Sequence, residues 1–145
     1  MEMEMSKILK NRKYLAINVI LFAILYLSVS FNKEFIRPVY GNLPIIGIIT
    51  GSFSNFMAAY IVGLFPVSQI ISKNIKMNKA RIIVYTVSTL VFLILTVEEI
   101  HPIFGASTQY DLFDIMASAV GSVFAILTFE LIINWSKTAK YFNPN

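Results

Sequence analysis

Apolar residues occur along this chain in four long blocks separated by short polar segments. The blocks cover residues 14–31, 44–65, 82–99 and 112–135. A bilayer core of about 30 Å requires about 20 apolar residues in a helix, so each block predicts one membrane span. Apolar residues fill these blocks instead of forming amphipathic stripes. We therefore expect an all-α fold, a four-helix transmembrane bundle, with short tails at 1–13 and 137–145.

The connections between the blocks carry an uneven distribution of charge. Of the 12 Lys and Arg residues, ten lie before the first block, between the second and third, or after the fourth; two, Lys33 and Arg37, follow the first. Basic segments of membrane proteins remain in the cytoplasm. The pattern predicts an N-in/C-in, multi-pass protein of the bacterial cytoplasmic membrane. The segment 67–79 follows Pro66 and is basic, so it is expected to lie on the inner leaflet.

Composition excludes several classes of protein. The chain is 57% hydrophobic, has no cysteine, and carries a net charge of +4. Without cysteine there are neither disulfides nor thiol chemistry. No basic face interleaved with aromatic residues appears, so nucleic acid is not an expected partner. The expected partners are membrane lipid, a further copy of the chain or a membrane partner protein.

Small and polar residues within two blocks predict helix contacts. Gly47 and Gly51 form a GxxxG pair, and small residues allow helices to approach closely in lipid. A second series of small residues follows helical spacing in the fourth block: Ala117, Ser118, Gly121 and Ala125. Asn55 should find a hydrogen-bond partner, because an unpaired amide in hydrocarbon is costly. Contacts within the chain and between copies are both consistent with these patterns.

An acidic cluster separates the third and fourth blocks, and it is the candidate site. It contains Glu98, Glu99, His101, Asp111 and Asp114. Asp111 is expected to cap the fourth helix, and Glu99 to be solvated. Asp114 shares a face with Ser118 and should point into the bundle.

Two basic residues are predicted to lie beside carboxylates near the ends of the spans. Arg37 is predicted to pair with Glu98 or Asp114, since a guanidinium–carboxylate pair is geometrically specific. Glu130 should lie near the inner edge and reach the interface beside Lys137.

Chemistry at the acidic cluster has several alternatives. Glu98, His101, Asp111 and Asp114 could bind a divalent metal, and paired carboxylates could serve hydrolysis. Their spacing matches no strong metal signature, and no nucleophile–histidine pair stands out. A proton or ion path would need carboxylates along the depth of the membrane. We therefore predict no catalytic residue, no metal and no cofactor.

The cluster resembles the C-terminal signature of the VanZ-like family of small bacterial membrane proteins. The matching residues are Glu98, Asp111, Asp114 and Gly121. His101, Ser118 and Ala125 depart from that signature, and an Arg near Thr108 is missing. The second block, from Gly51 to Asn55 and Phe56, also resembles the equivalent family helix. The resemblance implies an integral membrane protein of four or five helices, and some members are linked to resistance to teicoplanin-type glycopeptides.

Together these features predict a non-enzymatic, VanZ-like membrane protein. Its outward pocket would comprise Glu98, His101, Asp111, Asp114 and Arg37, and would bind a cell-envelope component or a lipid headgroup. The alternative is an oligomerising interaction or effector subunit that uses the small-residue faces. A small transporter or channel is a third interpretation.

Overall fold

The computed structural model describes residues 2–73, 75–101 and 111–142, with side chains for 14–71, 73, 75–101 and 111–135. These residues contain four long helices and no strand. The long helices are α1 (Glu2–Phe31), α3 (Pro44–Lys73), α4 (Met77–Ile100) and α5 (Leu112–Phe142). A π-helix, η1 (Asn32–Ile36), and a short helix, α2 (Arg37–Tyr40), follow α1 directly. The predicted all-α fold is confirmed.

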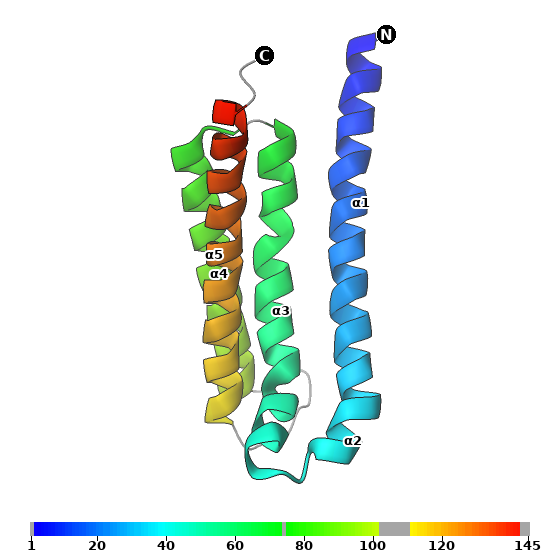
Figure 1. Ribbon diagram of the computed structural model, residues 1–145, viewed down its shortest axis with the longest axis vertical. Helices are drawn as coiled ribbons and strands as arrows, with labels where there is room; N and C mark the ends of the chain where they lie inside the picture. Colours follow the sequence, from blue (N-terminus) through cyan, green and yellow to red (C-terminus); the bar gives the residue numbers. More distant parts are fainter. Residues whose placement is uncertain (1, 74, 102–110, 143–145) are drawn as a thin grey trace.

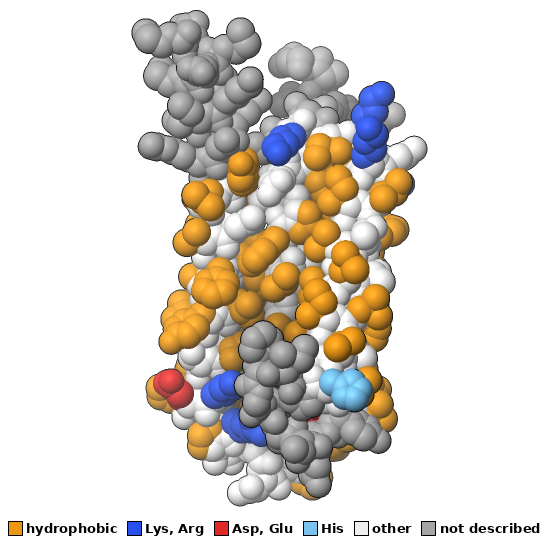
Figure 2. All heavy atoms as spheres, turned by 180° about the vertical axis from the view of Figure 1, so that it is seen from behind, with side chains coloured by type: hydrophobic (Ala, Val, Ile, Leu, Met, Phe, Trp, Pro, Cys, Tyr) orange, Lys and Arg blue, Asp and Glu red, His pale blue; other side chains and the backbone are white. Residues whose placement is uncertain are grey.

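The four long helices are long and apolar enough to cross a membrane. The candidate spans are Tyr14–Tyr40, Pro44–Ile71, Met77–Ile100 and Leu112–Trp135. Hydrophobic side chains cover the middle of the molecule in Figure 2, with coloured charged side chains towards its two ends. The predicted four-span bundle is therefore confirmed.

The bundle has two distinct ends. At the termini end, α1 begins, α5 ends, and α3 is joined to α4 (Figure 1). At the opposite end, which we call the hairpin end, lie α2, the end of α4 and the start of α5. Adjacent spans are thus antiparallel along the chain. The two acidic segments predicted to form one cluster belong to the same end.

The first helix extends beyond its predicted bounds in both directions. It begins at Glu2, where a tail was expected, and continues through η1 and α2 to Tyr40. The predicted connection 32–43 is therefore helical over most of its length. Pro38 lies in the first turn of α2, where its missing N–H costs no intrahelical hydrogen bond.

The second helix also passes the point at which it was expected to end. α3 contains Pro66 within its length and continues to Lys73. A proline removes one hydrogen bond from a helix, but packing can offset that loss. Val67 and Ile70 are buried in the core. The connection predicted over 67–79 is therefore shorter than expected, because its first half completes α3 and α4 begins at Met77.

The core lies where α3, α4 and α5 meet. Its buried residues include Leu64 on α3, Ala80 and Val84 on α4, and Ala125 and Phe129 on α5. Among the described residues of the long helices, α1 packs only against α3, and Figure 1 shows it set apart from α4 and α5. The bundle is thus a three-helix core with one helix added at its side.

Two hydrogen bonds fasten the first span, Tyr14–Tyr40, to α3 at separate depths. The Asn32 side-chain amide donates to the Thr50 carbonyl at 2.7 Å. The Ser68 hydroxyl donates to the Asn18 amide oxygen at 2.9 Å. Interhelical polar contacts stabilise membrane helices by about 0.6 kcal/mol on average. These two contacts fix the register between the helices, for which apolar packing alone has little preference.

Close approach between α3 and α5 depends on two glycines. A Cβ atom on Gly121 would collide with the Phe56 carbonyl oxygen and lie 3.1 Å from the Tyr60 nitrogen. A Cβ atom on Gly63 would lie 2.8 Å from the Ala125 Cβ and 3.2 Å from the Ser88 Oγ. Neither position has room for a side chain, so both glycines set the separation between the helices.

We expect Gly121→Ala to lower the free energy of unfolding by about 2 kcal/mol, because overpacking against backbone forces a shift of the helices. The matched control is Gly51→Ala. No described atom lies within 4 Å of the position of its added Cβ. Denaturation in mixed micelles measures both variants, and equal destabilisation would contradict the assignment of Gly121 as the close contact.

Candidate functional site

The ends of α4 and α5 are joined through Glu99 at the hairpin end. The Asp111 backbone N–H donates to the Glu99 Oε1 at 2.7 Å. Asp111 directly precedes α5, so this N–H lies outside the hydrogen-bonding ladder of the helix. The expectation that Glu99 is only solvated is therefore wrong, since its carboxylate satisfies a free donor of the next helix.

Asp111 occupies the cap position of α5. Its Oδ1 accepts the Phe113 N–H at 2.8 Å, which is the bond an N-cap side chain forms. The side chain is exposed. Its negative charge also lies at the positive end of the helix dipole. Capping accounts for Asp111 without any ligand.

Asp114 lies one turn further along α5 and is half-buried. Its backbone takes part in the helix: its N–H donates to the Asp111 carbonyl, and its own carbonyl accepts the Ser118 hydroxyl at 2.9 Å. Among the described residues, no hydrogen bond or ion pair involves its carboxylate. A half-buried carboxylate without such partners can accept a hydrogen bond from an added donor group.

The ion pair predicted between Arg37 and Glu98 or Asp114 is absent from the described part of the chain. Arg37 is exposed at the start of α2. α2 packs against η1 and α3, and no packing of α2 against α4 or α5 is seen among the described residues. The continuation of α1 as a helix therefore keeps α2, which carries Arg37, on the α1 side of α3 (Figure 1).

The remaining members of the predicted cluster lie at the end of α4. Glu98 is half-buried and has an interaction of its own. His101 is exposed, and its backbone N–H donates to the Val97 carbonyl at 2.8 Å. Within the residues that the structure describes, no three His, Asp or Glu side chains are grouped closely enough to hold a metal ion.

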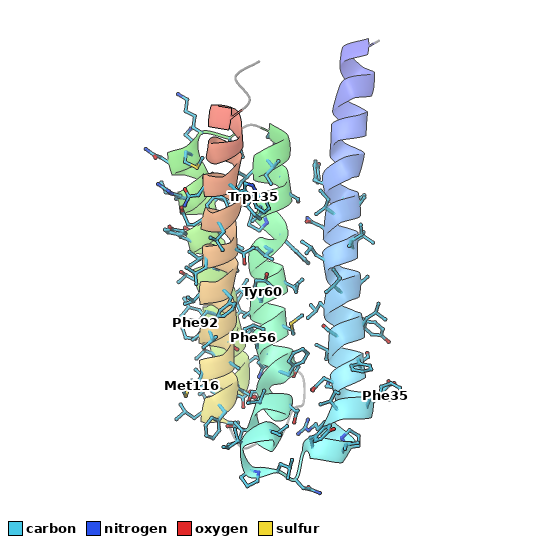
Figure 3. The ribbon with its side chains drawn as sticks, in the orientation of Figure 1. Phe35, Phe56, Tyr60, Phe92, Met116 and Trp135 are labelled. Atoms are coloured by element: carbon cyan, nitrogen blue, oxygen red, sulfur yellow. The ribbon has the colours of Figure 1, made fainter. Side chains whose placement is uncertain are left out.

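A groove of about 380 Å³ with an apolar lining lies between α3 and α5, beside the acidic first turn of α5. Its walls include Ile49, Phe53 and Phe56 of α3, and Phe113, Ala117 and Val120 of α5. Figure 3 shows Phe56 and Tyr60 on α3, where it runs beside α5. The Phe56 ring meets the Phe124 ring edge-on, with centroids 5.8 Å apart. The groove therefore begins at the hairpin end and extends into the span.

The small residues of the fourth block have different environments. Ser118, Gly121 and Ala125 are buried, the two last against α3, whereas Ala117 lines the groove. Gly47 lies against the Gly41 carbonyl in the preceding turn. Gly51 has no described atom close to it. Gly47 and Gly51 therefore do not form a helix contact between the described parts of the chain.

Asn55 is half-buried on α3, and the described residues contain no hydrogen bond to its side chain. The amides that connect helices are instead Asn18 of α1 and Asn32 of η1. The sequence predictions considered neither amide, although Asn18 lies within the first block and Asn32 directly follows it.

A second polar site, which the sequence predictions missed, joins α4 to α5 towards the termini end. The Glu130 carboxylate accepts two bonds from Arg81, Nε to Oε1 at 2.8 Å and Nη2 to Oε2 at 2.7 Å. The Tyr85 hydroxyl also donates to Oε1, at 3.0 Å. Glu130 had been assigned to Lys137, whose side chain lies outside the described residues. The signal was a lone carboxylate within an apolar block, which requires a cation at equal depth.

Comparisons of the chain with protein-family models, with curated proteins and with solved structures find no match.

We expect Glu130→Gln to destabilise the bundle more than Tyr85→Phe, because it leaves the Arg81 guanidinium without its bidentate partner. The charge swap Arg81→Glu with Glu130→Arg should recover part of the loss. Unfolding in mixed micelles measures all three, with Glu34→Gln as the control, since Glu34 is an exposed carboxylate at the other end. A double variant that is less stable than both Arg81→Glu alone and Glu130→Arg alone would show that the ion pair does not stabilise the contact between α4 and α5.

Proposed function

We propose that the protein is a non-enzymatic, VanZ-like protein of the bacterial cytoplasmic membrane, and that its hairpin end faces outward and binds a cell-envelope component or lipid headgroup. The distribution of Lys and Arg supports the orientation. The family resemblance supports the assignment, since Glu98, Asp111 and Asp114 lie where α4 ends and α5 begins. A link to teicoplanin-type resistance would follow from it.

The observation that carries this proposal is the Asp114 carboxylate. Asp111 is engaged in capping, and Glu99 accepts a backbone N–H. Asp114 is half-buried, and no donor to its carboxylate is found among the described residues. Its charge is favourable in the first turn of α5, and its oxygens remain available to a headgroup that carries hydrogen-bond donors or positive charge.

The alternative of an oligomerising subunit has less support. That interpretation relied on two small-residue faces, Gly47 with Gly51 in the second block and Ala117 to Ala125 in the fourth, being available to another chain. Gly121 and Ala125 instead contact α3 of the same chain. Gly51 has no described atom within 4 Å of an added Cβ, so a partner would have to pack at that face.

Labelling tests the orientation on which the proposal depends. Asn42 and Asn78 are both exposed and lie towards opposite ends of the bundle. Because the chain has no native cysteine, each can be replaced by a single cysteine for labelling. We expect an impermeant maleimide applied to intact spheroplasts to label Asn42→Cys and not Asn78→Cys. Labelling of Asn78→Cys alone would reverse the orientation and remove the outward site.

Lipid retention tests the role of Asp114. The protein is reconstituted with a total bacterial lipid extract and repurified in mild detergent, and retained lipid is identified by mass spectrometry. We expect Asp114→Asn to reduce the enriched lipid roughly fivefold, as loss of a partly exposed ion pair would. The control is Glu34→Gln, which removes an exposed carboxylate of η1. Equal retention by the wild type and Asp114→Asn would contradict the proposal.

A further inference from the structure

The α3–α5 groove has a definite length, and an aromatic pair lies beyond its inner end. Phe113 and Val120 lie seven residues apart on α5, which corresponds to about 10 Å along a helix. One turn beyond Val120, the Phe124 ring packs edge-on against Phe56. The groove therefore accommodates a segment of a chain that enters from the hairpin end, and the aromatic pair lies where the segment would stop.

The walls of the groove suit an acyl chain. The α3 wall presents phenylalanine and isoleucine side chains, and the α5 wall is recessed at Ala117, since alanine is the smallest residue on it. Ser52 is the polar residue of the lining, and it is buried. Burial of each methylene group in such an environment contributes about 0.8 kcal/mol relative to water, but very little relative to lipid. The groove alone therefore selects no particular lipid.

Selectivity must come from the rim of the groove. Phe113 forms the wall at the mouth, and its backbone N–H is bonded to Asp111. Asp114 is the next residue along the chain. Two carboxylates thus flank the wall residue at the mouth. Lys33 and Arg37 belong to η1 and α2, which contact α3 and α1 but not α5 among the described residues. The α5 side of the mouth is therefore acidic.

We propose that this groove and its rim form one site for an amphiphile, with an acyl-chain segment between α3 and α5 and a headgroup ammonium at Asp114. The inference deepens the proposed function and rests on it, because it requires the hairpin end to face outward. An ammonium group donates to carboxylate oxygens and matches their charge. A headgroup whose sole charge is a phosphate would be repelled by Asp111 and Asp114.

Quenching of a tryptophan placed in the groove tests this site. The chain has one tryptophan, Trp135, at the far end of α5, so Trp135→Phe gives a silent background. Phe53→Trp then places a reporter in the groove wall. Two vesicle preparations are compared, both made of phosphatidylglycerol with a minor fraction of a lipid brominated on its acyl chains. The brominated lipid has an ethanolamine headgroup in one preparation and a glycerol headgroup in the other.

We expect the groove reporter to be quenched at roughly fivefold lower mole fraction by the brominated ethanolamine lipid than by the glycerol lipid, a difference typical of one exposed ion pair. Asp114→Asn should abolish that preference. Ala117→Phe should reduce quenching by both lipids, because it fills the recess. If Ala117→Phe fails to insert, Ala117→Met serves the same purpose. The control reporter, Val123→Trp, lies exposed on α5 and should be quenched equally by both lipids.

Equal quenching of the groove reporter by the two lipids would overturn the proposal. It would also be overturned if Ala117→Phe or Ala117→Met left the quenching of that reporter unchanged. Either result can be distinguished from failure of the proposed function. If lipid retention still depends on Asp114 while the reporter shows no preference, the headgroup site stands and the acyl-chain groove is wrong. If retention is also independent of Asp114, both fail.

Discussion

Backbone contact between α3 and α5 is the constraint on which the rest of the bundle depends. Gly121 lies against the Phe56 carbonyl, and Gly63 brings Ala125 and Ser88 to the same crossing. Lipid tails are as apolar as leucine, so burial of apolar area supplies little drive for association in a bilayer, and close packing must supply it. With α5 held on α3 by small residues, α4 fills the remaining side and the core of α3, α4 and α5 follows.

That packing also determines the positions of both polar sites. α4 and α5 run antiparallel, and two polar contacts connect them near opposite ends: Glu99 with the Asp111 N–H, and Arg81 with Glu130. The two contacts agree on one register, since moving along α4 from Arg81 to Glu99 covers about the same length as moving back along α5 from Glu130 to Asp111. A shift by one turn would break both. The two polar contacts therefore specify the register between α4 and α5, which apolar packing leaves undefined.

The sequence was sufficient for the four spans, because their length and lack of charge follow directly from the thickness of a bilayer. It was insufficient for the ends of the first two helices. The first block ends at Phe31, but the helix continues through η1 and α2 to Tyr40. α3 continues past Pro66 to Lys73, where packing offsets the lost hydrogen bond. The Ala117–Ala125 spacing identified a contact face, whereas Gly47 and Gly51 have the same spacing without an opposing helix. The Arg81–Glu130 pair spans 49 residues, so it depends on a register that no local pattern contains.

The position of α1 explains why the candidate site is confined to the other three helices. The most apolar window of its span has no buried residue, and its sequence-distant hydrogen bonds, Asn18 with Ser68 and Asn32 with Thr50, both lead to α3. Helix α1 is thus positioned by a few polar contacts, and α5 by close packing. Because the groove walls come from α3 and α5 and the acidic rim from α5, the site is built by the most tightly packed pair of helices. Closely packed walls of this kind hold the Asp114 carboxylate in place relative to the groove.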